Sequence, residues 1–187
     1  MTEEILKSYE VLKKGGVILY PTDTVWGLGC DATIPKAIDR IIQIKKRPEN
    51  KSMIILLDLT EKLFQYVDNI PEIAFDFINS IQTPLTIIYP KAKNLPKNLV
   101  AQDGSIAIRI VRDDFCKKLI NMLNKPLVST SANLSGEPTP LIFSKINKEI
   151  VKMVDYAVEY NRSRIKEVKS STVIRFNLNG EYDIIRS

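Results

Sequence analysis

The sequence predicts an α/β fold in which one twisted, mixed β-sheet is covered by helices. Short, continuous apolar runs such as residues 53–57 are typical of strands that are buried on both faces. Other segments space their apolar residues at helical intervals, and the two kinds of segment mix without strict alternation. The chain has 187 residues, the length of one well-buried domain, so we expect a single domain spanning 1–187.

Glycine and proline positions delimit the elements in the first half of the chain. Gly15 and Gly16 end the first helix, Pro35 begins the second, and Pro48 makes the chain extended at Arg47. The expected elements are a helix at 3–14, a strand at 17–20, a helix at 35–45, a strand at 53–57 and helices at 61–67 and 71–80.

The second half is expected to contribute most of the strands. A loop at 91–104 separates the first two strands, and Asp113 begins a helix. The expected elements are strands at 85–89 and 105–110, a helix at 113–123, a strand at 126–130, a short helix at 144–151, a charged loop at 161–170, and strands at 156–160, 172–175 and 182–186.

The composition excludes several classes of chemistry. The chain contains no histidine, which excludes Ser–His and Cys–His nucleophiles and the usual imidazole metal sites. Cys30 and Cys116 belong to no CxxC pair, so reduced thiols in a cytoplasmic protein are expected. The N-terminus lacks the apolar core of a secretory signal, and the longest strongly apolar run is too short to cross a bilayer, so no membrane partner is expected.

Three polar segments interrupt the apolar pattern. They are YPTDTVWGLG at 20–29, KKRP at 45–48 and STSANLSG at 129–136, and each follows or ends an apolar element. Together they supply cations, hydroxyls, an amide and glycines that allow close approach. The net charge of +5 also fits an anionic ligand, and it permits RNA contact without requiring it. This set favours a ligand with a phosphate chain and a small polar head.

Each segment taken alone has a simpler interpretation. Lys45 and Arg47 can place two charges over one anion, but cations are also common at solvated helix C-termini. Ser129, Ser131 and Asn133 can line one pocket wall, because alternate strand residues share a face, but the same types also cap helices and form turns.

The glycines of the first segment match neither a dinucleotide fingerprint nor a phosphate-binding P-loop. Trp26 fits a core aromatic best. Arg109 lies inside the apolar strand SIAIRIV, where an unpaired charge would be costly, so we expect an anionic partner from the protein or from a ligand. Ser171 stands at a strand start and Arg186 near the end of the chain.

The order of these motifs is more specific than any one of them. PTDTVWGLG is followed by KxRP, by a strand with an inward Arg109, by SxSANxSGxP, by STV and by a late Arg186. In this order they closely resemble the Sua5/YrdC family of L-threonylcarbamoyladenylate synthases. The resemblance spans residues 15–186, and the KxR and SxN elements are the hallmark of that family. Without the extra C-terminal domain of the longer branch, the chain looks like the short, single-domain bacterial type.

The resemblance implies a YrdC-like fold with a large central cavity, and a reaction. L-threonine, bicarbonate and ATP would give threonylcarbamoyl-AMP and pyrophosphate, and a downstream tRNA threonylcarbamoyl-transferase complex would use the product. Lys45 and Arg47 would be the catalytic pair beside the phosphates. ATP would be bound by Lys45, Arg47, Lys51, Ser105, Asn133 and Arg186, and threonine by Thr24, Arg109, Ser131 and Ser171. Mg²⁺ would arrive on the phosphates, so no metal site in the protein is expected.

The chain departs from the family pattern at three places. Leu56 stands where members of the longer branch often have histidine, and Lys51 stands where asparagine is common. Thr139, Pro140 and Leu141 replace the SPT that follows the SAN motif, which puts that ATP contact in doubt.

Two other classes of function compete with the synthase. One is a module that binds tRNA or double-stranded RNA without turnover, which the excess of basic residues would suit. The other is a relative that performs carbamoyl transfer, similar to the corresponding domain of hydrogenase-maturation proteins.

Overall fold

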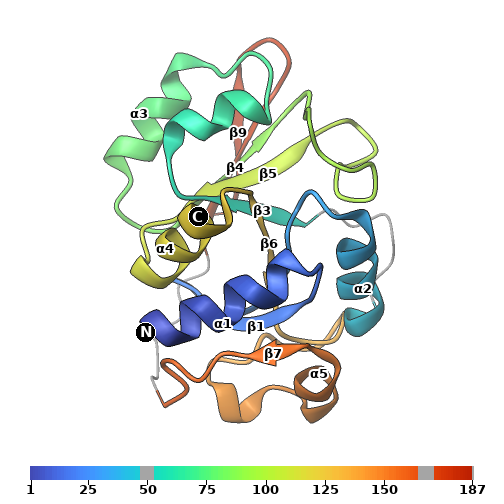
Figure 1. The fold of residues 1–187 in the computed structure, drawn as a ribbon. Helices are drawn as coiled ribbons and strands as arrows, with labels where there is room; N and C mark the ends of the chain where they lie inside the picture. Colours follow the sequence, from blue (N-terminus) through green and yellow to red (C-terminus); the bar gives the residue numbers. More distant parts are fainter. Residues whose placement is uncertain (47–52, 164–170, 187) are drawn as a thin grey trace.

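The structure, a computed structural model, describes residues 1–46, 53–163 and 171–186. These residues form a mixed nine-stranded sheet in the order β7-β1-β2-β6-β3-β5-β4-β8-β9 (Figure 1). The pairs β1–β7, β3–β5 and β4–β8 are parallel, and the other pairs are antiparallel. The strands are β1 (Ile18–Pro21), β2 (Trp26–Gly29), β3 (Ile54–Leu57), β4 (Leu85–Tyr89), β5 (Ile106–Ile110), β6 (Leu127–Ser131), β7 (Tyr156–Ala157), β8 (Thr172–Phe176) and β9 (Tyr182–Arg186).

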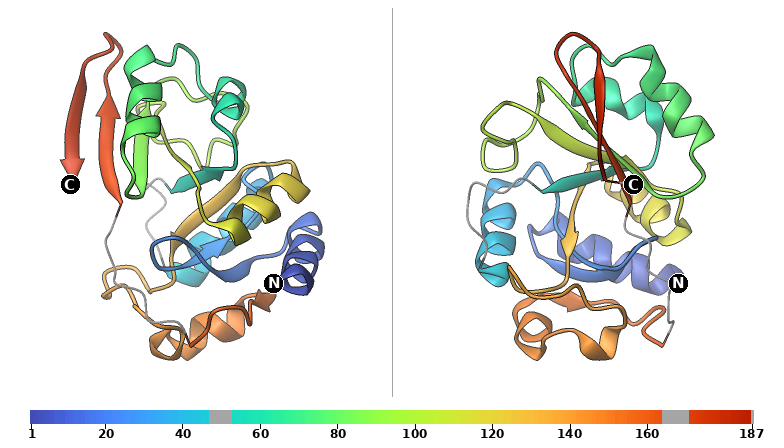
Figure 2. Two further views of the ribbon diagram at one scale, coloured as in Figure 1. Left: turned by 90° about the vertical axis from the view of Figure 1, so that its left-hand side faces the viewer. Right: turned by 180° about the vertical axis from the view of Figure 1, so that it is seen from behind.

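The helices pack around this sheet (Figures 1 and 2). Helices α1 and α4 lie side by side, with α1 against β1 and β7 and α4 against β3. Phe77 of α3 stacks on Phe176 of β8. The helices are α1 (Thr2–Lys13), α2 (Pro35–Lys45), α3 (Glu72–Ser80), α4 (Asp114–Leu123) and α5 (Lys148–Met153), with 3₁₀ turns η1 (Thr60–Gln65) and η2 (Phe143–Lys145). The α/β class with a mixed, helix-covered sheet is therefore confirmed.

Local sequence signals explain where several elements begin and end. Pro35 is the first residue of α2, where its missing N–H costs no hydrogen bond. Helix α2 ends at Lys46, which adopts a left-handed conformation with φ of 50°. The Asp113 carboxylate accepts a hydrogen bond from the backbone N–H of Cys116 and so caps α4.

Some expected elements differ from those observed. Strand β2 was not expected, because its sequence WGLG carries two glycines, which disfavour strands. Of residues 61–67, expected as a helix, only 61–65 are helical, as part of the 3₁₀ turn η1, and the expected helix at 144–151 divides into η2 and α5. Strand β7 covers only the first two of the residues expected at 156–160.

The two glycines of β2 have a steric reason. A Cβ on Gly29 would lie 2.6 Å from the Tyr20 ring and 2.8 Å from the Val128 carbonyl oxygen. Tyr20 of β1 is fully buried, and burial raises the pKa of its hydroxyl well above the ordinary value. Trp26 is buried edge-on against Phe143, so its interpretation as a core aromatic is confirmed.

Both cysteines are buried, and among the described residues they form no disulfide. Burial raises the pKa of the Cys30 thiol, so this side chain is a packing group and not a reactive thiolate. Within the described parts of the chain, no helix combines the length and the apolar character that spanning a membrane requires.

Candidate active site

One face of the sheet is hollowed into a cavity of about 520 Å³. This volume lies within the range of about 300–1,000 Å³ that is usual for small-molecule sites. The cavity arises because side chains in register across neighbouring strands share a face. Ile54 of β3 pairs with Ala107 of β5 and with Ser129 of β6, and all three line the cavity. Thr86 of β4 pairs with Val173 of β8, and both of these residues also line the cavity.

The lining is positive and rich in hydroxyl groups. Its charged side chains are Arg109 and Arg186, and among the described lining residues there is no carboxylate. Eight hydroxyl side chains complete the polar surface: Thr22, Thr24, Thr86, Ser129, Thr130, Ser131, Thr139 and Ser171. Gly27 adds a stretch of wall without a side chain. Cations and hydroxyl donors suit an anionic ligand.

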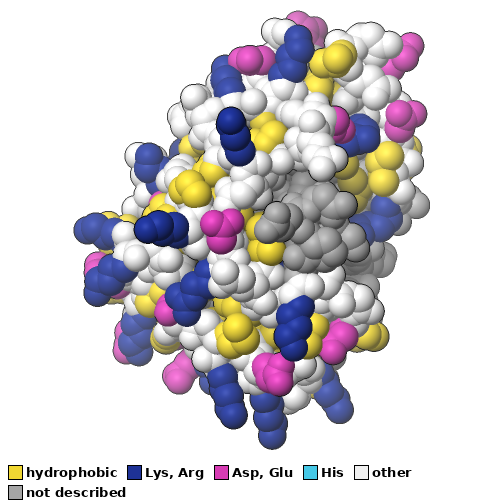
Figure 3. All heavy atoms as spheres, turned by 90° about the vertical axis from the view of Figure 1, so that its right-hand side faces the viewer, with side chains coloured by type: hydrophobic (Ala, Val, Ile, Leu, Met, Phe, Trp, Pro, Cys, Tyr) yellow, Lys and Arg dark blue, Asp and Glu magenta, His cyan; other side chains and the backbone are white. Residues whose placement is uncertain are grey.

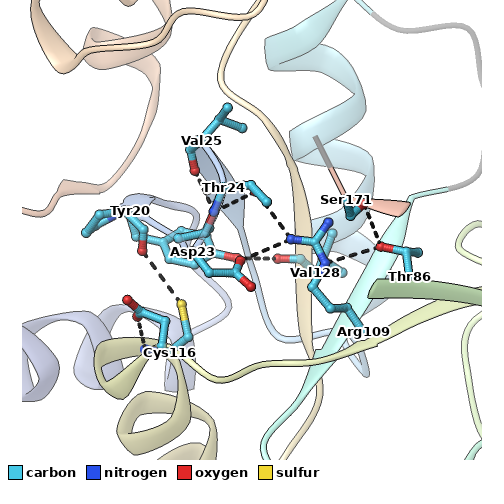
Figure 4. A network of polar contacts seen from close by, with 12 residues as sticks. Tyr20, Asp23, Thr24, Val25, Thr86, Arg109, Cys116, Val128 and Ser171 are labelled. Atoms are coloured by element: carbon cyan, nitrogen blue, oxygen red, sulfur yellow. Dashed lines mark hydrogen bonds and ion pairs between the residues drawn. The ribbon is translucent and has the colours of Figure 1, made fainter. Parts of the chain in front are cut away.

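Arg109 is the buried cation of this wall, with 7% of its surface exposed. Its Nη1 lies 3.1 Å from the Asp23 carboxylate and 3.2 Å from the Thr24 hydroxyl, and its Nε donates to the Thr86 hydroxyl at 3.2 Å (Figure 4). The expectation that this arginine has an anionic partner is confirmed, and Asp23 is that partner. The three contacts come from the β1–β2 connection and from β4, so they fix the guanidinium at the cavity wall.

Hydroxyl groups connect Arg109 to the second arginine. The hydroxyl oxygens of Thr86 and Ser171 lie 3.0 Å apart. Arg186 of β9 donates through Nη2 to the Ser171 hydroxyl at 3.1 Å and through Nε to the Ser171 carbonyl at 3.0 Å. Segments that lie far apart in the sequence therefore meet in one polar network (Figure 4).

Lys45 lies behind the wall and not on the molecular surface. Only 1% of it is exposed, so the interpretation as a solvated helix end is wrong for this residue. Its Nζ donates to the carbonyl oxygens of Ser131 and Asn133 at 2.5 and 2.7 Å. Ser131 in turn donates to the Asn133 side-chain oxygen, and the backbone N–H of Ser135 donates to the Lys45 carbonyl at 2.9 Å. The end of α2 thus supports the polar loop after β6.

Of the ten residues predicted for the site, five line the cavity and two stand behind it. Thr24, Arg109, Ser131, Ser171 and Arg186 are in the wall, and Lys45 and Asn133 support it. Arg47 and Lys51 lie outside the described residues. Ser105 precedes Ala107 by two residues but does not line the cavity. Its hydroxyl donates to Asp103 at 2.6 Å and helps lower the pKa of that carboxyl group.

The positions where the chain departs from the family pattern also have places in the structure. Thr139 lines the cavity, so this segment keeps a hydroxyl at the wall despite the altered sequence. Leu56 is fully buried and pairs in register with Arg109 on β5.

Sequence reasoning missed Asp23 and Thr86. Asp23 is separated from Arg109 by 86 residues, and no local pattern links the two. Thr86 sits in an apolar strand, where a threonine is typical for its β-branched shape alone. The available signal was the alternation of β4, which places Thr86 and Ile88 on one face.

The residues of the cavity do not form a metal-binding cage. Among residues 1–46, 53–163 and 171–186, no group of three or more histidine, cysteine or carboxylate side chains could hold a metal ion. The hydroxyl groups of the wall are weak ligands for a hard cation compared with carboxylate or phosphate oxygens.

The fold and the wall together define an α/β protein with a cavity on one face of a mixed sheet, lined by two arginines and by hydroxyl side chains. The family model Sua5_yciO_yrdC, described as "Telomere recombination", matches residues 10–187. The chain belongs to this Sua5/YciO/YrdC family.

Relatives and solved structures agree with this assignment. The chain is 38% identical over 173 residues to the threonylcarbamoyl-AMP synthase of Pseudoalteromonas translucida, covering 88% of this chain and 92% of the relative. For the Vibrio campbellii enzyme of the same name the identity is 30% over 183 residues, covering 92% and 97%.

Two solved structures have the same fold as this chain. The structure of P. abyssi Sua5 complexed with L-threonine is similar with a TM-score of 0.84 at 28% identity, covering 92% of this chain and 50% of the other. E. coli YciO gives a TM-score of 0.84 at 27% identity, covering 100% and 90%.

Proposed function

We propose that this protein is an L-threonylcarbamoyladenylate synthase. It forms threonylcarbamoyl-AMP and pyrophosphate from L-threonine, bicarbonate and ATP. The observation that carries the proposal is the cavity itself, whose described wall has two arginines, eight hydroxyl side chains and no carboxylate. Relatives named for this activity match over most of the chain at 30–38% identity.

The chemistry needs positioning and charge neutralisation more than a titrating side chain. The threonine amine adds to bicarbonate with loss of water and gives an N-carboxylate. One carboxylate oxygen then attacks the α-phosphorus of ATP, and the bond to pyrophosphate breaks. Both reacting partners are anionic, so fixed cations and hydroxyl donors lower the barrier by holding them together.

The wall offers a place for each reactant. In this proposal Arg109 binds the threonine carboxylate, with Thr24, Ser131 and Ser171 around the amino acid. Arg186, Asn133, Arg47 and Lys51 serve the nucleotide, whereas Ser105, whose hydroxyl donates to Asp103, stays outside the cavity. Lys45 contributes positive charge from behind the wall and holds the loop of Ser131 and Asn133 in place. Mg²⁺ would be held by the nucleotide phosphates, since the described wall offers it no carboxylate.

The product has a reactive mixed anhydride, which requires an acceptor. In this proposal a downstream tRNA threonylcarbamoyl-transferase complex in the cytoplasm supplies that acceptor. Contact of this chain with tRNA or double-stranded RNA is secondary. Basic and acidic side chains are interspersed on the described part of the face in Figure 3, so this face does not favour RNA binding.

The test is pyrophosphate release from ATP by the purified protein. Release should depend on both L-threonine and bicarbonate, and a carbonate-depleted buffer is the control. Release that is independent of either reactant would contradict the proposal. Stimulation by carbamoyl phosphate in place of threonine and bicarbonate would favour the carbamoyl-transfer alternative. The similarity to HypF, at 23% identity and a TM-score of 0.83, shows the fold alone.

A further inference from the structure

The hydroxyls of Thr86 and Ser171 form a pair that is held between two arginines. Arg109 Nε donates to the Thr86 hydroxyl at 3.2 Å, and Arg186 Nη2 donates to the Ser171 hydroxyl at 3.1 Å. The two hydroxyl oxygens lie 3.0 Å apart, and either can donate to the other. Both residues are buried to 2% exposure, and both line the cavity.

A count of the protons in this pair shows what it offers to a ligand. Each hydroxyl carries one proton, and each oxygen already accepts one hydrogen bond from an arginine. One of the two protons occupies the space between the oxygens. Among the described residues neither hydroxyl has another acceptor, so one proton stays available whichever oxygen donates. The pair therefore has one hydroxyl proton at the cavity wall that no described residue accepts.

The two arginines make this donor well suited to an anion. An arginine N–H that donates to a hydroxyl oxygen polarises the O–H bond, because hydrogen bonds in a chain strengthen one another. A carboxylate or carbamate at this wall would thus accept a charge-assisted hydrogen bond from one hydroxyl of the Thr86–Ser171 pair.

We infer that Thr86 is a positioning residue for the anionic end of the amino-acid substrate. It acts by holding both the Arg109 guanidinium and the Ser171 hydroxyl. This inference rests on the proposed function, since it takes the ligand to be L-threonine. It adds a residue of β4 to a site that the motifs place on the β1–β2 connection, the end of α2, β5, β6 and the segments around β8 and β9.

The test compares Thr86→Val with Thr86→Ser. Valine has nearly the same shape without the hydroxyl, and serine keeps the hydroxyl without the methyl group. Thr86→Val should weaken the calorimetric affinity for L-threonine roughly tenfold or more, the typical effect of losing a hydrogen bond to a charged group. Thr86→Ser should restore the affinity to within about threefold of the unmodified protein, by the same reasoning.

A matched control and a double-mutant cycle separate positioning from general stability. Thr172→Val makes the same change in β8, beside Ser171, at a residue that does not line the cavity and makes no side-chain hydrogen bond among the described residues. It should leave threonine affinity unchanged. In the cycle, Ser171→Ala should cost much less affinity in the Thr86→Val background than alone, because the two hydroxyls act as one unit.

The outcomes distinguish this inference from the proposed function. If the unmodified protein binds no threonine, the proposed function fails. If it binds threonine and Thr86→Val binds equally well, or if Ser171→Ala and Thr86→Val are additive, the role of Thr86 is overturned. An equal loss of affinity in Thr86→Ser and Thr86→Val would likewise contradict it, because the hydroxyl would then be irrelevant.

Discussion

Arg109 combines burial, charge and access to the cavity in one side chain. Its contacts with Asp23, Thr24 and Thr86 fix the guanidinium plane. The ion pair with Asp23 balances the charge of the guanidinium, which reduces the cost of burying it. Lys45, the cation of the KxR motif that lies within the described residues, donates to backbone carbonyls instead. The two cations therefore have different places, since Arg109 faces the cavity and Lys45 supports the loop after β6.

Replacing Arg109 should separate the two ligand sites. We expect Arg109→Ala to reduce threonine affinity at least thirtyfold, roughly the effect of truncating one partner of a buried charge pair. Nucleotide should still bind, and titration calorimetry with each ligand measures both. Arg109→Lys is the matched variant, which keeps the charge but loses the planar fork of donors. Its threonine affinity should lie between those of the unmodified protein and Arg109→Ala. Equal loss of both ligands in Arg109→Ala would contradict the assigned role.

At the scale of elements, β2 is the strand that the sequence does not predict. Its glycines allow Tyr20 and β6 to approach closely, and a Cβ is excluded at Gly29 by contacts of 2.6 and 2.8 Å. Gly27 of the same strand is less restricted, since a Cβ added there would lie no closer than 3.2 Å to its nearest neighbour, Ser129 Oγ.

Alanine at these two positions should therefore have unequal effects on stability. Gly29→Ala should lower the free energy of unfolding by about 1–3 kcal/mol, the usual cost of overpacking. Gly27→Ala should cost less, because a flexible hydroxyl can move away. Urea denaturation of both variants measures the difference. Equal stability of the two variants would show that the Gly29 packing is not limiting.

Helix α1 is tied to the β7 edge of the sheet by the Glu4 carboxylate. It accepts hydrogen bonds from the Tyr156 hydroxyl at 2.8 Å and from the backbone N–H of Glu159 at 2.6 Å. Burial raises the pKa of Glu4, but these hydrogen bonds outweigh burial and hold the pKa below its ordinary value of 4.5. The ionised form is therefore the one that stabilises the folded chain.

This shift gives a pH dependence with a definite sign. The folded-state pKa is depressed, so the contribution of Glu4 is complete above about pH 4.5 and is lost as the pH falls through the folded-state value. In Glu4→Gln this part of the acid destabilisation should disappear, as measured by thermal unfolding between pH 6 and pH 3. Glu3→Gln is the control, because its exposed carboxylate contacts only Lys7 in the described structure. The same acid profile for Glu4→Gln and the unmodified chain would exclude this role.

The fold was largely predictable because its signals are local. Helix α2, for example, was expected over the same residues that it occupies, from its proline and its apolar spacing. The cavity was less predictable, since its register depends on pairs such as Ile54 with Ser129 and Ala107 with Ile88. The motifs located Thr24, Arg109, Ser131, Ser171 and Arg186 in one wall. Asp23 and Thr86 could not be found in that way, because each is defined by a partner more than twenty residues away.

At the scale of the whole molecule, the site spans most of the width of the sheet. Its wall runs from Gly27 on β2 to Arg186 on β9, and β9 is an exposed edge strand. A ligand that contacts both ends therefore links strands that are otherwise joined only through their neighbours. Binding stabilises the folded state by mass action, since the unfolded chain has no such cavity.

Thermal unfolding with ligands should show this linkage. At a hundred times the dissociation constant, a ligand adds about 2.7 kcal/mol, which corresponds to a rise in Tm of roughly 5–10 °C for a chain of this size. We expect ATP and threonine each to raise the Tm, and Arg109→Ala to respond to ATP alone. An unchanged Tm at saturating concentrations of both ligands would contradict a shared cavity.

The absence of histidine from this chain has a consequence for kinetics. Arginine and aliphatic hydroxyls keep one ionisation state between about pH 5 and pH 9. The charged and hydroxyl groups of the described wall therefore present the same electrostatic surface throughout the physiological interval. If turnover rises with pH, the cause would be the substrates, because the fraction of free threonine amine and the bicarbonate–carbonate equilibrium both change with pH. Rate profiles recorded at fixed concentrations of those species should accordingly be flat.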